Sequence, residues 1–115
     1  MADRPIIRLH HIKESIDNIR RLLHQKNVGD VRAEAVTRAA LERFLEVISE
    51  ASRHIPLRWK QEFGSDIIWS DIAALGNVLR HAYDNIDVGI LWAAYRNDLD
   101  PLERAIDAML AAHDK

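Results

Sequence analysis

Apolar residues recur three and four positions apart along nearly the whole of this chain, which is the spacing of one buried face of an α-helix. No alternating strand pattern competes with it. Only four glycines and three prolines interrupt the 115 residues, so we expect few turns and long elements. The sequence therefore predicts an all-α, up-and-down antiparallel bundle of four to five helices with short connections. The first apolar stripe consists of Leu9, Ile12, Ile16, Ile19 and Leu23.

Turn signals and breakers divide the pattern into separate helices. Gly29 is available for a turn, and Pro56 stops the helix before it. Asp100 is expected as the N-cap of the last helix, a variant of the capping box with Asp in place of Ser or Thr. The expected helices cover about 5–26, 31–54 and 69–86, followed by a short helix from Asp87 and a last one from Asp100.

The composition limits the classes of function. One domain covering residues 1–115 is expected from the length. The net charge of -2 gives no basic excess, so any RNA contact must come from a local cluster. The absence of cysteine excludes disulfides and a cysteine-type zinc site. No segment approaches the roughly 20 apolar residues needed to span a bilayer, the first nine residues do not resemble a signal peptide, and a cytoplasmic location is expected.

An unusual polar group interrupts the helix expected over 69–86. Asn77, Arg80, His81 and Tyr83 supply an amide, a guanidinium, an imidazole and a phenol within seven residues. At about 100° per residue, the first three share a polar face with Asp84, and Tyr83 lies at the edge of the apolar stripe. Such a set can bind a phosphate and move a proton. Each member also has an ordinary explanation, as a solvated side chain, an exposed ion pair or a packed ring.

A glycine inside a helix costs about 1 kcal/mol relative to alanine, so something should offset Gly76. It lies one turn before Arg80 and Tyr83, and we expect it to leave open space beside both residues. Two explanations stay open. Another backbone approaches there, for example that of a second subunit, or the space accommodates a ligand.

The order Asn-x-Leu-x-His-x-Tyr over residues 77–83, followed by Asp87 and Trp92, resembles the HepT-like branch of the HEPN superfamily. The likeness covers nearly the whole chain. It extends to the opening helix around Leu9, to the second helix and its exit, and to the segment 97–102. The resemblance implies a helical bundle that forms a homodimer, with two copies of the motif in a shared cleft.

Members of this family act as ribonuclease toxins of type VII toxin–antitoxin systems, beside a small nucleotidyltransferase antitoxin. The resemblance therefore implies an endoribonuclease that acts on RNA without a metal or cofactor. His81 would be the base, Arg80 the cation for the phosphate, and Asn77 a residue that orients the imidazole or binds the phosphate. Tyr83 matches the tyrosine to which the antitoxin transfers adenylate. A metal enzyme is not expected, because His10 and His11 are adjacent and point in different directions.

This chain departs from the family motif at one position. The family has an arginine five residues before the histidine, and this chain has Gly76. Arg80 is the nearest candidate substitute, although it lies on a different part of the helix surface. Two alternatives to the nuclease therefore stay open: a catalytically inactive helical interaction module, and a nucleotide-binding subunit that serves a nucleotidyltransferase.

Overall fold

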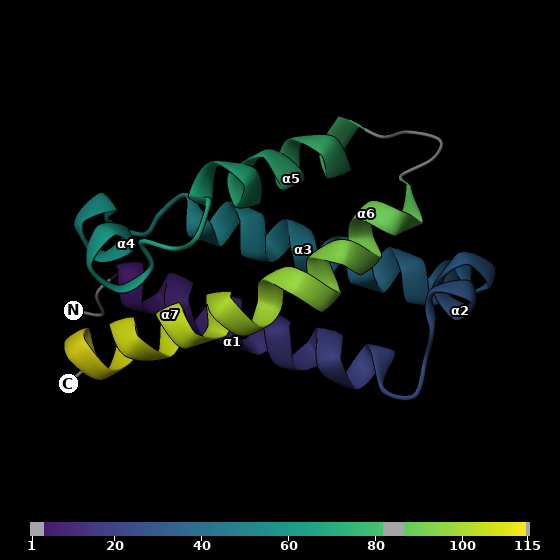
Figure 1. The fold of residues 1–115 in the computed structure, drawn as a ribbon, viewed down its shortest axis with the longest axis horizontal. Coiled ribbons are helices and arrows are strands. Elements are labelled where there is room, and N and C mark those ends of the chain that lie inside the picture. Colours follow the sequence, from purple (N-terminus) through teal and green to yellow (C-terminus); the bar gives the residue numbers. More distant parts are fainter. Residues whose placement is uncertain (1–3, 82–86, 115) are drawn as a thin grey trace.

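The computed structural model describes residues 4–81 and 87–114, and within these ranges the chain forms helices and no strand, as predicted. Figure 1 shows the order of the elements. They are α1 (Arg4–Leu23), α2 (Val28–Ala33), α3 (Ala35–Ser52), α4 (Leu57–Phe63), α5 (Trp69–His81), α6 (Val88–Ala93), the π-helix η1 (Ala94–Asp98) and α7 (Leu99–His113).

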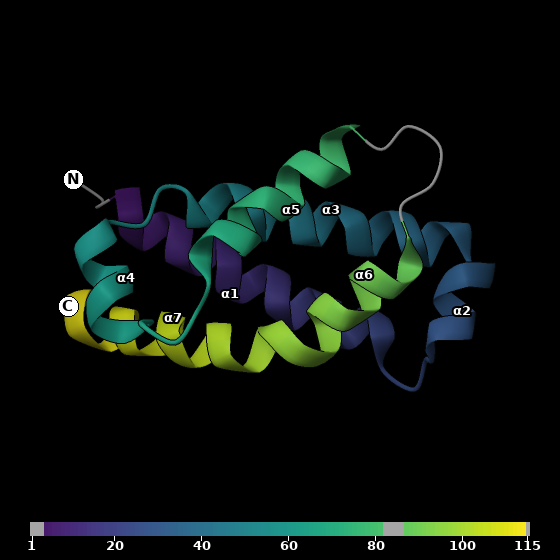
Figure 2. The ribbon, with the colours of Figure 1, turned by 45° about the horizontal axis from the view of Figure 1, so that its top comes forward.

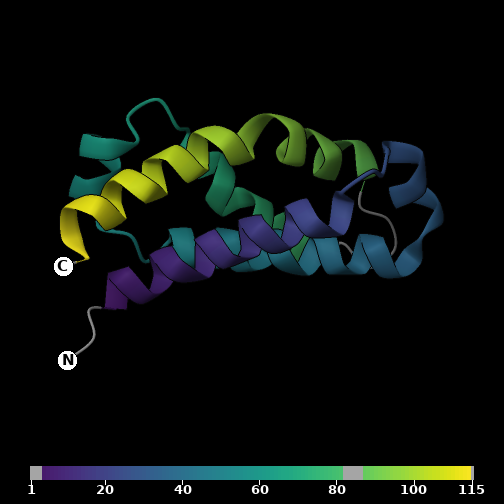
Figure 3. The same cartoon turned by 90° about the horizontal axis from the view of Figure 1, so that it is seen from below.

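The long helices run alternately in opposite directions, which confirms the up-and-down arrangement (Figure 1). Helix α1 packs along α3 on one side and along α7 on the other, and α5 lies along the outer side of α3. The view from below shows α7 beside α1 (Figure 3). The short helix α4 covers the end of α7, next to both chain termini (Figure 2).

The core lies between α1, α3 and α7. All five residues of the predicted α1 stripe are at most 1% exposed. Burying one Leu or Ile side chain stabilises a fold by about 1.5–3 kcal/mol, so this stripe contributes strongly to stability. The partners of the stripe are Leu41, Leu45 and Ile48 on α3 and Leu102, Ile106 and Met109 on α7.

Ion pairs join the outer edges of α1 and α7. Arg20 donates hydrogen bonds to Glu103 and Asp100, and Lys13 donates to Asp107. The hydrogen bond to Glu103 holds the pKa of Arg20 above its usual value, so its guanidinium stays charged. Asp100 therefore lies in the first turn of α7 and pairs with Arg20, and its predicted role as an N-cap is wrong.

Other predicted boundaries also shift. The turn expected near Gly29 is instead the start of α2. There the side chain of Asn27 accepts a hydrogen bond from the backbone N–H of Asp30, and the side chain of Asp30 accepts one from the backbone N–H of Asn27. Among the described residues, the one non-glycine residue with positive φ is Gln25, at 62°. The helix expected over 31–54 is interrupted at Glu34, whose extended backbone separates α2 from α3.

Helix α5 is less covered than its sequence predicts. Helical spacing predicts a core face of Ile72, Leu75, Leu79, Ala82 and Ile86. Ala82 and Ile86 lie outside the described residues, and of the other three only Leu79 is buried. The reason is that α5 packs mainly against α3 and has few contacts with the other described elements. Within the described residues, no helix is both long and apolar enough to cross a membrane.

Candidate active site

Three of the four predicted site residues lie on the C-terminal half of α5. Asn77, Arg80 and His81 are all exposed there. Arg80 and Asn77 are in contact, because the Arg80 Nη2 donates a hydrogen bond to Asn77 Oδ1 one turn earlier. His81 is the last described residue of the helix. Tyr83, the predicted modification site, lies outside the described residues, as does Asp84.

Gly76 is buried against the neighbouring helix α3. The hydroxyl of Ser49 accepts a hydrogen bond from the Gly76 N–H at 3.0 Å and donates one to the Ala73 carbonyl at 3.1 Å. A Cβ on residue 76 would lie 2.5 Å from Ser49 Oγ, far inside contact distance. The close approach thus comes from a side chain of the same chain, and the predicted open space is wrong.

Arg80 folds back over this close contact. Its Nη1 lies 3.4 Å from the position that a Cβ on Gly76 would occupy. The same nitrogen is 3.9 Å from Glu50 Oε2 on α3, and Nη2 is held by Asn77. The guanidinium therefore has partners on two helices, beside the position where the family arginine would begin.

A polar hollow of about 520 Å³ opens next to Arg80, between α1, α3 and α5. It contains three guanidinium groups, one imidazole and two carboxylates. Sequence reasoning assigned no function to three of these residues, Arg8, His11 and Arg43. The sequence contains a weak signal for this cluster, because Arg8 and His11 are three residues apart and so share the polar face of α1. The lining residues are Arg8, His11, Arg43, Glu46, Val47, Glu50, Ala51 and Arg80.

His81 is not among the residues that line this hollow. The structure thus brings Arg80 together with Asn77 and with the hollow, while His81 projects from the last turn of α5. Arg80 and His81 both lie in that last turn, where the partial negative charge of the helix end favours positively charged side chains.

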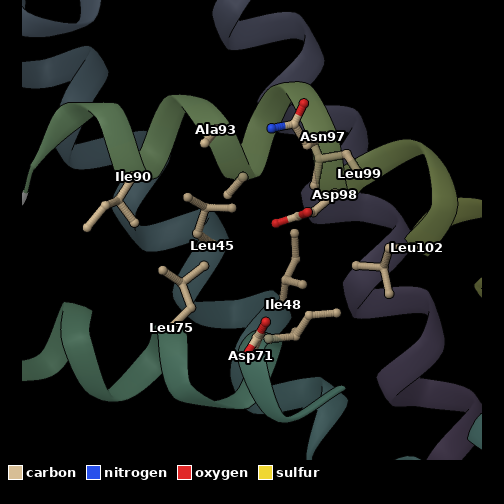
Figure 4. Close-up of a pocket in the computed structure, with 12 residues that line it drawn as sticks. Leu45, Ile48, Asp71, Leu75, Ile90, Ala93, Asn97, Asp98, Leu99 and Leu102 are labelled. Atoms are coloured by element: carbon tan, nitrogen blue, oxygen red, sulfur yellow. The ribbon is translucent and has the colours of Figure 1, made fainter. Parts of the chain in front are cut away.

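The opposite side of α5 borders an apolar groove of about 320 Å³ (Figure 4). Leu75 and Ile72 form one wall, Leu45 and Ile48 the floor, and the α6–η1 segment with Ile90 the other wall. At one end Asp71 and Asp98 enter the groove. Burial, and secondarily the charge of Asp71, raises the pKa of Asp98 above its usual value.

No group of three or more His, Asp or Glu side chains within residues 4–81 and 87–114 is arranged to hold a metal ion. Around Arg80 the described residues supply guanidinium, amide and imidazole groups beside the carboxylates of Glu46 and Glu50. The first three kinds of group can bind an anion and transfer a proton.

An up-and-down helical bundle with this polar group on one late helix defines a class of small helical proteins, and comparison with known proteins identifies the family. The family model described as HepT-like ribonuclease matches residues 12–109. The protein named "Probable ribonuclease HepT" of Thermococcus cleftensis is 33% identical over 95 residues, which cover 83% of this chain and 86% of that protein. The chain belongs to the HepT-like ribonuclease family.

Two further relatives extend the comparison. A Methanocaldococcus jannaschii protein named "Gamma-glutamylcyclotransferase and putative RNase" is 28% identical over 109 residues, which are 95% of this chain but 49% of that protein. This chain thus spans about half of that relative's length. A "Putative RNase" of Caldanaerobacter subterraneus is 24% identical over 102 residues, covering 89% of this chain and 90% of that protein. No solved structure matches the chain.

Proposed function

We propose that this protein is a metal-independent endoribonuclease that cleaves RNA in the cleft of a homodimer, as the toxin of a type VII toxin–antitoxin system. The observation that carries the proposal is the position of Arg80. Its guanidinium is held over Gly76 by Asn77 and Glu50, in the same helical turn as His81. A cation is thereby placed beside the position that the family arginine would occupy.

The reaction uses the nucleophile that RNA itself carries, the 2′-hydroxyl. His81 accepts the 2′ proton while the 2′-oxygen bonds to phosphorus, and the bond from phosphorus to the 5′-oxygen breaks. A protonated imidazole from the second protomer gives the departing 5′-oxygen its proton. Arg80 stabilises the charge that develops on the phosphate oxygens, and Asn77 holds the Arg80 side chain in place.

The homodimer is part of the same proposal. Helix α5 packs mainly on α3, and no other described element covers its apolar groove. Ile90, which lines the groove, is 49% exposed, and Val78 on α5 is 46% exposed. A second copy that covers these side chains would bury apolar surface and bring the two α5 helices close together.

The proposed antitoxin is a nucleotidyltransferase that transfers adenylate to Tyr83. A bulky anion next to His81 would block the cleft and neutralise Arg80. Intact mass after co-expression with such an enzyme tests this step, since modified protein gains the mass of one adenylate. Tyr83→Phe should abolish the gain, and Tyr95→Phe, which changes the chain's other tyrosine, should retain it. A gain that persists in Tyr83→Phe places the modification elsewhere.

RNA cleavage by the purified protein in the presence of a chelator tests the nuclease. The protein is expressed without a partner, and several single-stranded RNAs are used. We expect cleavage by the wild type and none by His81→Ala, while His24→Ala, an exposed histidine after α1, cleaves normally. Equal cleavage by His81→Ala and the wild type would overturn the proposed role of His81.

The contact between Ser49 and Gly76 favours a second candidate function. A side chain at position 76 would collide with Ser49, so α3 and α5 pack in a way that does not accommodate the family arginine. A non-catalytic module that retains the dimer and binds a nucleotidyltransferase fits this packing. Failure of a folded, unmodified wild-type dimer to cleave any RNA would support this second function.

A further inference from the structure

The polar hollow beside Arg80 differs in charge from the rest of the molecule. The whole chain carries a net charge of -2, yet the hollow gathers Arg8, Arg43 and Arg80 from three different helices. Its volume of about 520 Å³ falls in the range of ligand sites in proteins. A local cluster of this kind is what an acidic protein needs in order to bind a nucleic-acid backbone.

Ion pairs position two of the three guanidinium groups. Arg43 Nη1 lies 2.8 Å from Glu46 Oε1, and Arg80 Nη1 lies 3.9 Å from Glu50 Oε2. No carboxylate among the described residues lies within ion-pair distance of Arg8, which is half-buried at the edge of the hollow. Three guanidinium groups and two carboxylates leave one net positive charge. A single phosphodiester, which carries one negative charge, balances it.

This chain lacks one positive charge of the family motif, so binding of a phosphate needs another source of positive charge. The family motif places an arginine at position 76, and this chain cannot, because Ser49 fills the space. Arg80 takes over part of that role, and Glu50 draws its guanidinium toward the hollow. A phosphate in the hollow would therefore contact Arg80 from the side away from Asn77.

We propose that the hollow between α1, α3 and α5 binds a backbone phosphate of the RNA strand through Arg8 and Arg43, next to Arg80. This inference rests on the proposed function, which it extends from the reacting group to the flanking strand. Arg8 and Arg43 are binding residues in this scheme. Arginine suits the role, because its planar donors match two oxygens of one phosphate.

Binding of a single-stranded, fully 2′-O-methylated oligonucleotide tests the inference without cleavage. Fluorescence anisotropy gives the affinity of the full chain over a series of salt concentrations. We expect Arg8→Ala and Arg43→Ala each to weaken binding by about tenfold at low salt, and the slope of log K against log salt to fall by about 0.7 for each lost contact. The control is Arg104→Ala, which removes an exposed arginine of α7 away from the hollow and should bind like the wild type.

The cleavage assay separates this inference from the proposed function. If both variants bind normally while His81 is required for cleavage, the hollow is not a phosphate site and the nuclease stands. If the wild type neither binds nor cleaves RNA, both proposals fail. Displacement of the oligonucleotide by AMP at comparable concentration would assign the hollow to a mononucleotide and overturn its assignment to the RNA strand. Weakened binding together with a raised KM in both variants, but not in Arg104→Ala, supports the inference.

Discussion

The hydroxyl of Ser49 on α3 lies between two backbone groups of α5, accepting from the N–H of Gly76 and donating to the carbonyl of Ala73. This contact brings the two helices together more closely than any side chain at position 76 would permit. The glycine is therefore a requirement of helix packing.

Gly76→Ala should destabilise the protein, although alanine favours an isolated helix by about 1 kcal/mol. The new Cβ would lie 2.5 Å from Ser49 Oγ, and overpacking of this kind costs about 1–3 kcal/mol. Urea denaturation gives the free energy of unfolding. In Ser49→Ala/Gly76→Ala the loss should be smaller than the sum of the two single losses, because the 2.5 Å contact with the hydroxyl is removed and only the one with the Cβ of residue 49, at 3.1 Å, remains. Increased stability of Gly76→Ala alone would contradict the packing argument.

Arg80→Ala should lower kcat for RNA cleavage by about 10²- to 10³-fold, as removal of a donor that stabilises transition-state charge does elsewhere. Arg80→Lys keeps the charge but loses the fixed contact with Asn77, so we expect an intermediate rate. Arg58→Ala removes an exposed arginine of α4 and serves as the control. Wild-type kcat in Arg80→Ala would mean that another cation serves the phosphate.

The sequence predicts those parts of the fold that depend on local periodicity. The stripe from Leu9 to Leu23 is buried as expected, and Asp87 begins α6 by accepting from the N–H of Gly89. The incomplete burial of Ile72 and Leu75 could not be predicted, because it depends on how α5 is placed relative to α6 and α7.

The candidate site was predicted only along one helix. Asn77 and Arg80 are one turn apart, so helical spacing suffices to place them together. Arg8 and Arg43 come from α1 and α3, and their meeting with Arg80 depends on long-range packing. The lack of room for a side chain at Gly76 depends in the same way on Ser49 of another helix. Nothing in the sequence marks Ser49 as the residue that contacts Gly76.

Ile90→Glu should shift the proposed homodimer toward monomer. The residue is 49% exposed and lines the apolar groove beside α5, so a carboxylate there would lose its hydration on association. Light scattering after gel filtration gives the mass. Val36→Glu changes a residue that is 84% exposed at the start of α3 and should leave the mass unchanged. If Ile90→Glu keeps the wild-type mass, the groove is not the interface.

Arg20→Ala should cost about 1 kcal/mol in the free energy of unfolding, because it removes the hydrogen bond to the partly buried Glu103 and leaves that carboxylate with Lys13 as its remaining partner on α1. Arg21→Ala is the matched control. Its neighbouring guanidinium is exposed and bonds to Asn18 of its own helix, so we expect a loss below about 0.5 kcal/mol. Equal losses in the two variants would show that the pairs between α1 and α7 contribute no specific stability.

Asp98→Asn should stabilise the protein modestly at neutral pH. The folded pKa of Asp98 lies above the ordinary 3.8, so ionisation of this residue favours the unfolded chain. This loss of stability is absent below a pH of about 3.8, where the carboxyl is protonated in both the folded and the unfolded chain. It develops as the pH rises above 3.8 and is complete above the folded pKa. We expect a gain below about 1 kcal/mol, because the side chain is partly solvated.

Urea midpoints at several pH values test this expectation. The difference between Asp98→Asn and the wild type should fade toward acid pH. Asp17→Asn, at an exposed position of α1, should show no such trend. A pH-independent difference would attribute the effect to packing.

The segment predicted as two helices, the second starting at Asp100 on the basis of its capping pattern, is one continuous helical run in which the π-helix η1 joins α6 to α7. Along the continuous run 88–113, buried residues recur three or four apart, aside from the adjacent Ala105 and Ile106, and the one wider gap is between Ala94 and Leu99, which are five apart. The π turn absorbs that extra position, which in a regular α-helix would rotate the following side chains by about 100°. The α6 part can therefore face α2 and α3 while α7 faces α1 and α4. Deleting one residue within 94–98 would shorten the spacing of these two buried positions from five to the four of a regular α-helix, so both halves would keep their faces without the π turn.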